Sequence, residues 1–246
     1  MQHKNSNKIW KYIFFIALGI VVLGVVISCF YFVDMYINKP QSVIDSSSKI
    51  ILKENPIDFK PLYEQNSDIY AWIKIPNTRI DYPIVQSAED DSFYLNHNYD
   101  KEYTKYGAIY TEMQNSTDFS DPNTVIYGHN MRNGTMFRDL HKFRETDFFD
   151  ENKYIYVYTP GHILTYEICA AYRYDNRHIL NSFNFSDPSV FSEYIEFVKN
   201  PKSIILQKRE VQMDTSSKLL TLSTCISNDN YRYLVQGVLK KDEPTK

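Results

Sequence analysis

Residues 219–239 read LLTLSTCISNDNYRYLVQGVL, and this stretch decides the fold. Polar and apolar side chains alternate along its first part, so a strand places Thr221, Ser223 and Cys225 on one face and leucines on the other. A turn rich in Ser, Asn and Asp follows, and Arg232 then opens a second apolar strand. If the two strands form a hairpin, the Cys225 thiol and the Arg232 guanidinium face each other across its open end.

An isolated cysteine is usually a small buried hydrophobe, but Cys225 lies among polar residues and opposite a permanent cation, which favours the thiolate. A cysteine nucleophile also needs a proton partner. The apolar strand 125–127 delivers Gly128-His129 to its end, so His129 is the candidate, although a structural histidine fits this spacing equally well. The remaining histidines are N-terminal or stand in polar contexts: His3, His97, His141, His162 and His178.

Seven further regions of the sequence show short alternations of apolar and polar residues bounded by turn residues, which is the pattern of β-strands. Together with the first strand of the hairpin, the eight predicted strands are 70–75, 80–85, 107–110, 124–127, 154–159, 164–174, 219–224 and 233–239. Asp187 and Pro188 form a helix start, and apolar residues then recur at helical spacing to Val198; shorter helices are expected within 134–149. The sequence therefore predicts a mainly β sandwich or closed barrel with inserted helices.

The amino-acid composition further narrows the class of protein. The 246 residues are 43% hydrophobic and 23% charged, which is typical of a globular protein, and the net charge of −3 argues against a nucleic-acid partner. Seven glycines against 21 tyrosines favour strands over Gly-rich phosphate loops. Three cysteines are too few for a disulfide scaffold, and nucleotide, dithiol and zincin motifs are missing from the sequence.

Residues 12–33, YIFFIALGIVVLGVVISCFYFV, form an uncharged run of 22 residues, long enough for a helix to span a bilayer. Three lysines precede the run and Asp34 ends it, which predicts a single-pass anchor in the cell membrane with a cytoplasmic N-terminus. A lipoprotein site at Cys29 and a cleaved signal peptide are the alternatives. All three place the rest of the chain outside the membrane.

The predicted organisation has five parts. Residues 1–11 are a cytoplasmic N-terminus, 12–33 the anchor, 34–66 a stalk and N-terminal helical extension, 67–241 the catalytic β-barrel and 242–246 a tail. Within the extension, 41–53 is the expected helix and Pro56 and Pro61 mark the end of the segment. Without residues 1–34 the chain keeps 24 basic and 29 acidic residues, a net charge of −5, so the anchor alone must hold it at the membrane.

With these residues in place the sequence resembles the sortases, cysteine transpeptidases anchored on the surface of Gram-positive bacteria. TLSTC at 221–225 matches the family's TLxTC signature, His129 its histidine and Arg232 its arginine. The likeness spans about 60–241, and VIYGHNMRNGTMFRDL at 125–140, YGAIY at 106–110 and the helix at 188–199 are similar to class B members.

The resemblance implies an eight-stranded sortase-type β-barrel with an N-terminal helical extension, and neither a cofactor nor a metal. It implies a thiol protease-like transpeptidase that cleaves a C-terminal sorting signal at a Thr and joins the acyl product to an amine of peptidoglycan. In that reaction Cys225 is the nucleophile, His129 the proton donor and acceptor, and Arg232 stabilises the oxyanion or holds the substrate carbonyl.

Tyr127, Ser223 and Thr224 flank these residues and are candidates for substrate contacts, or else pack and cap turns; Asn96 is a weaker candidate. Cys169 lies on an alternating strand and is expected in the core, since a disulfide to Cys225 would abolish the nucleophile.

Two other functions compete with this interpretation. A papain-like surface peptidase places its Cys before its His and uses Asn or Asp as third member, unlike the order here. A non-catalytic adhesin or scaffold domain would tolerate Cys225→Ala without loss of function.

Overall fold

The structure is a computed structural model that describes residues 23–29, 52–226 and 230–246. The chain divides into two compact units, residues 1–50 and 51–246, and in the first unit residues 23–29 are helical. Among the described residues no helix is both long and apolar enough to cross a membrane. The rest of the predicted anchor, 12–22 and 30–33, lies outside the described residues, as does 41–51 of the expected helix.

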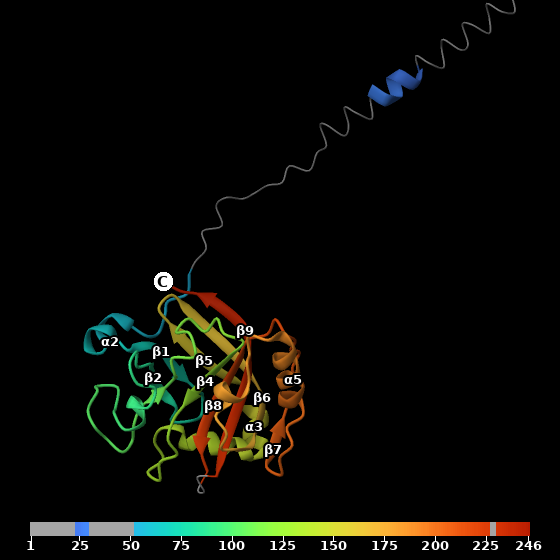
Figure 1. Cartoon of the computed structure of the whole chain (residues 1–246). Helices are drawn as coiled ribbons and strands as arrows, with labels where there is room; N and C mark the ends of the chain where they lie inside the picture. Colours follow the sequence, from blue (N-terminus) through green and yellow to red (C-terminus); the bar gives the residue numbers. More distant parts are fainter. Residues whose placement is uncertain (1–22, 30–51, 227–229) are drawn as a thin grey trace, which may run out of the picture. The chain divides into compact units, whose positions relative to one another are not determined.

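The second unit is built on a closed β-barrel (Figure 1). Strand order is β5-β1-β2-β3-β4-β8-β9-β6, and pairing of β5 with β6 closes the ring of eight, while β7 extends the sheet beyond β6. The eight predicted strands and the barrel are thus confirmed. The bounds are β1 Ile69–Lys74, β2 Asp81–Val85, β3 Ile109–Tyr110, β4 Asn123–Tyr127, β5 Tyr154–Thr159, β6 His162–Asp175, β7 Leu206–Lys208, β8 Leu219–Cys225 and β9 Tyr231–Pro244.

Two features of the sheet differ from the sequence-based prediction. β7 is only three residues long and alternation cannot reveal so short a strand; it pairs with residues 170–172 of β6. β9 extends to Pro244, into the segment expected as a tail, because its backbone pairs with β6 as far as His162. Residues 240–243 are all charged, so backbone pairing and not apolar side chains holds this end in the sheet.

The helices lie in the connections. They are α2 Phe59–Gln65, α3 Thr146–Glu151, α4 Ile179–Ser182 and α5 Pro188–Lys199, with 3₁₀ helices η1 Phe93–Leu95 and η2 Phe137–Arg144. α5 is as predicted, with Asp187 accepting from the N–H of Ser189 at 2.8 Å. η2 and α3 confirm the helices expected within 134–149.

α2 lies at the end of the segment 34–66 and includes Pro61, which was expected to mark the end of that segment. Asp58 caps the helix by accepting from the N–H of Lys60, and Pro61 lies in the first turn, where a missing N–H costs no hydrogen bond. Residues 52 and 53, the described part of the helix expected at 41–53, are not helical, and Lys53 forms a bridge to Thr245 beside the end of β9.

The barrel wall separates two apolar layers. Alternate side chains of β8 and β9, including Leu222 and Val235, fill the interior. The opposite faces of these strands, including Leu219 and Leu234, pack beneath α5, which lies on one side of the barrel in Figure 1. Cys225 belongs to the outward face of β8, since it follows Leu219 at even spacing.

A buried polar network joins β8 to its neighbours beneath α5. The Thr221 hydroxyl donates to Oδ1 of Asn123 (2.8 Å) and accepts from Nε2 of Gln236 (2.9 Å). The Gln236 amide also donates to the Tyr194 hydroxyl and accepts from that of Tyr172. Thr221 and Gln236 are fully buried, so each hydrogen bond replaces water that the folded chain excludes.

We expect Thr221→Val to lower the free energy of unfolding by about 2 kcal/mol, because it keeps the shape but leaves buried polar atoms of Asn123 and Gln236 short of a partner. Urea unfolding measures the change. Thr117→Val, on an exposed loop residue, is the matched control and should stay within about 0.5 kcal/mol. Equal stability of the two variants would contradict a structural role for the network.

Candidate active site

The β8–β9 hairpin places Cys225 directly opposite Arg232. Cys225 is the last residue of β8, Arg232 is the second of β9, and the two are partners in the antiparallel register. This confirms the hairpin predicted from the sequence. Side chains at paired positions of neighbouring strands lie on the same face, so both project from the outward face of the barrel.

Parallel pairing of β4 with β8 brings the segment of His129 to the same rim. Tyr127 is in register with Ser223, and the next residue, Gly128, donates its N–H to the Ser223 carbonyl at 3.2 Å. The Thr224 hydroxyl returns a hydrogen bond of 2.7 Å to the Gly128 carbonyl. Ser223 and Thr224, the two residues before Cys225, therefore hold Gly128, the residue before His129.

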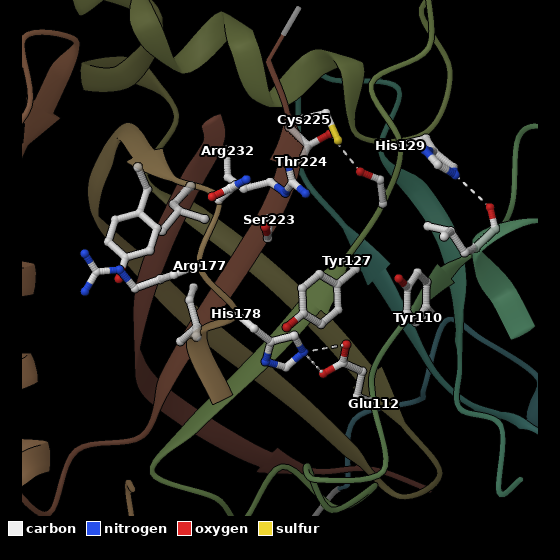
Figure 2. Close-up of a pocket in the computed structure, with 16 residues that line it drawn as sticks. Tyr110, Glu112, Tyr127, His129, Arg177, His178, Ser223, Thr224, Cys225 and Arg232 are labelled. Atoms are coloured by element: carbon white, nitrogen blue, oxygen red, sulfur yellow. Dashed lines mark hydrogen bonds and ion pairs between the residues drawn. The ribbon is translucent and has the colours of Figure 1, made fainter. Parts of the chain in front are cut away.

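A pocket of about 270 Å³ lies over this rim, and Cys225, His129 and Arg232 all line it. Figure 2 shows Cys225 and Arg232 close together at one end and His129 beyond Cys225. Of the predicted substrate contacts, Tyr127, Ser223 and Thr224 line the pocket. Asn96 is exposed at the end of η1 and does not line it, whereas its neighbour Leu95 does.

The Leu95 carbonyl determines which nitrogen of His129 carries hydrogen. Nε2 of His129 lies 2.7 Å from this oxygen. A carbonyl oxygen only accepts, so the neutral ring carries its hydrogen on Nε2 and leaves a lone pair on Nδ1. Nδ1 is then the atom available for proton exchange.

A second histidine, which the sequence analysis passed over, lines the far part of the pocket. Nε2 of His178 lies 2.7 and 2.9 Å from the two carboxylate oxygens of Glu112, and Nδ1 accepts from the N–H of Asn181. Tyr127 lies between this pair and Cys225 in Figure 2, and burial, with the Glu112 charge nearby, raises the pKa of its phenol. The pair ties α4, which borders the pocket, to the end of β3. Glu112 and His178 are 66 residues apart, so spacing gave no signal for it.

A third histidine contacts the backbone of Cys225 itself. Nε2 of His141, on η2, donates to the Cys225 carbonyl at 3.1 Å, and Nδ2 of Asn130 donates to the same oxygen at 2.9 Å. Nothing in the sequence near His141 indicates this contact, because the partners are 84 residues apart.

Cys225 forms no disulfide with another described cysteine. Cys169 is buried beneath α5, as predicted, and burial raises its pKa to about 12. Cys29, Cys169 and Cys225 are all free thiols. No group of three or more His, Cys, Asp or Glu suited to a metal ion is found in the part of the chain that the structure describes.

Comparisons with known proteins agree with this geometry. The sortase domain family matches residues 73–240. Sortase B of Listeria monocytogenes is 32% identical over 240 residues, covering 91% of this chain and 95% of the relative. The crystal structure of Clostridium perfringens sortase B superposes with a TM-score of 0.68 at 34% identity, covering 75% of this chain and all of that one. A crystal structure of Bacillus anthracis sortase B in complex with AAEK1 gives the same TM-score at 29% identity, covering 77% of this chain and 88% of that one.

The chain therefore belongs to the sortase family, whose members are transpeptidases acting on sorting-signal peptides. Within that family it is a class B sortase, as VIYGHNMRNGTMFRDL at 125–140, YGAIY at 106–110 and the helix at 188–199 indicated.

The His141 ring makes stability depend on pH. Burial, with Arg144 and then Arg138 nearby, lowers its pKa from 6.5 to about 4. Between these values the unfolded chain binds a proton that the native chain does not, so the free energy of unfolding falls as pH drops through this window. We expect a contribution of about 2 kcal/mol after allowance for partial solvent exposure.

Urea unfolding at several pH values across this window tests the effect. The curve of His141→Gln, which cannot titrate, should be flatter than that of the wild type. Parallel curves for the wild type and His141→Gln would contradict a lowered pKa of His141 in the native state.

Proposed function

We propose that this protein is a membrane-anchored cysteine transpeptidase that cleaves a sorting signal at a Thr and transfers the acyl product to a cell-wall amine. The observation that carries the proposal is the convergence of Cys225, His129 and Arg232 on one pocket. A thiol, an imidazole and a guanidinium supply a nucleophile, a proton carrier and an anion-stabilising group.

In the first half-reaction the Cys225 thiolate attacks the Thr carbonyl carbon, and the carbonyl oxygen becomes an oxyanion near Arg232. The peptide C–N bond then breaks, the leaving amine takes a proton from Nδ1 of His129, and a thioester remains on Cys225. The Leu95 carbonyl supports this role, because it accepts from Nε2–H in both the neutral and the protonated ring.

In the second half-reaction an amine attacks the thioester carbon. His129 takes the proton of the attacking amine, the C–S bond breaks, and the Cys225 thiolate and the protonated His129 are restored. Hydrolysis by water is the slower competing path. We assign Ser223 and Tyr127 to the peptide groove, whereas the Thr224 hydroxyl, already bonded to Gly128, positions the rim.

Cleavage of a peptide library with a fixed Thr, with and without an added amine, tests the activity. We expect the amine to raise turnover and to appear in the product. Cys225→Ala should abolish cleavage, His129→Ala should lower kcat at least 10²-fold, and Arg232→Lys should lower it roughly 10²-fold, because a point charge does not replace a planar guanidinium.

Three outcomes would contradict the proposal. Turnover that ignores the amine would indicate a peptidase, and absence of cleavage across the library would indicate a binding domain. Cleavage by Cys225→Ala would exclude the thiol as nucleophile.

We further propose that residues 12–33 anchor the protein in the cell membrane, with the N-terminus in the cytoplasm and the barrel outside. The support is the uncharged run itself and the three lysines before it. An uncleaved anchor leaves Cys29 within the span and unmodified.

An impermeant thiol reagent applied to intact cells should label Cys225, and Cys225→Ala should lose this label. The chain should stay with membranes after an alkaline wash, and deletion of 12–33 should release it. Labelling only after the cells are broken would contradict the orientation, and a mass increase on Cys29 would identify a lipoprotein instead.

A further inference from the structure

The Cys225 carbonyl lies at the point where β8 loses its neighbour. Carbonyls two residues apart on a strand point to the same side, and the Ser223 carbonyl bonds the N–H of Gly128 on the β4 side. The Cys225 carbonyl therefore also faces that side. β4 ends at Tyr127, so no strand backbone continues there to supply the next donor.

Two side chains donate in place of that strand. Nδ2 of Asn130 lies 2.9 Å and Nε2 of His141 lies 3.1 Å from the Cys225 oxygen, so both lone pairs of the carbonyl are used. On the β9 side, the N–H of Ile226 reaches the Tyr231 carbonyl at 3.4 Å, a long hydrogen bond. The two side-chain donors are thus the shorter contacts at the end of the strand.

Each donor is fixed by its own surroundings. Oδ1 of Asn130 accepts from Arg138 at 3.0 Å, which turns Nδ2 toward Cys225. The ring centroids of His141 and Tyr233 lie 5.0 Å apart. The Arg144 guanidinium lies 5.0 Å from the centroid of the Tyr233 ring. Burial and the neighbouring arginines keep His141 neutral, and a neutral ring bonded to a carbonyl through Nε2 carries its hydrogen there.

We propose that His141 and Asn130 are positioning residues that together hold the Cys225 carbonyl and so aim the thiol at the reacting carbonyl. The inference rests on the proposed function of Cys225. Holding this peptide plane fixes the backbone of the nucleophile at the end of β8. Because Asn130 follows His129 directly, its hydrogen bond also sets the distance between the proton carrier and the thiol.

The two properties of His141, its flat ring and its donor, are separated by two substitutions. His141→Phe keeps a flat ring against Tyr233 and loses the donor, whereas His141→Gln keeps an amide donor near the position of Nε2. His162→Phe, on an exposed histidine at the far end of β6, is the matched control for the change itself.

The full-length chain is assayed for kcat and KM with the cleaved peptide, and alkylation of each cysteine is followed by peptide mass mapping. We expect His141→Phe to lower both kcat and the alkylation rate of Cys225 about tenfold, with KM within about twofold, since misplacement slows the reaction more than binding. His141→Gln should recover most of the lost rate, and His162→Phe should match the wild type.

Buried Cys169 reports on folding in the same experiment, because it reacts only if the apolar layer beneath α5 opens. If His141→Phe makes Cys169 reactive, Asn130→Ala tests the same carbonyl from the other donor, and a wild-type kcat in that variant overturns the proposal. It is also overturned if His141→Phe keeps the wild-type kcat, or if His141→Gln is as slow as a folded His141→Phe.

Cys225→Ala distinguishes a failure of this inference from a failure of the proposed function on which it rests. Activity in Cys225→Ala refutes the proposed function and with it the positioning role. An inactive Cys225→Ala together with a fully active His141→Phe refutes the positioning role and leaves the proposed function standing.

Discussion

The structure depends on the placement of β8 between a parallel and an antiparallel neighbour. Its pairing with β4 fixes where the chain leaves the sheet at Gly128, and its pairing with β9 sets Cys225 opposite Arg232. Both registers are fixed by burial, because a shift of one residue would turn Leu220 and Leu222 out of the barrel interior. The same hydrophobic constraint that stabilises the barrel therefore determines which side chains meet at its rim.

Because the barrel is closed, β8 and β9 have one face toward its interior and one face toward its outside. The interior is filled by apolar side chains, whereas the outward face of β8 and β9 changes along its length. Beneath α5 it is apolar and carries the Thr221–Gln236 network, and at the open end it carries Ser223, Cys225 and Arg232. A side chain at the end of a strand is held in place by the sheet and can still line an open pocket, as Cys225 does.

Three histidines surround this end, and their partners give them different properties. His129 bonds a carbonyl through Nε2 and so keeps a lone pair on Nδ1. His178 uses both nitrogens, one on the N–H of Asn181 and the other on Glu112, and so fixes the border of the pocket. His141 is held neutral by burial and by Arg144 while it donates to the Cys225 carbonyl. The side-chain type is the same in each case, and the environment sets the chemistry.

The sequence by itself determined the barrel strands, α5, the burial of Cys169 and the Cys225–Arg232 hairpin, because each follows from local alternation, capping or a short turn. It also singled out His129, since a strand delivers it to a loop, although the spacing alone did not separate it from a structural histidine. Only the tertiary structure decided the rest. β7 and α2 lack a sufficient local pattern, and the contacts of His141 and Asn130 with Cys225 join residues 84 and 95 positions apart. Such contacts depend on how separate segments pack against the end of one strand, and periodicity along the chain carries no information about that packing.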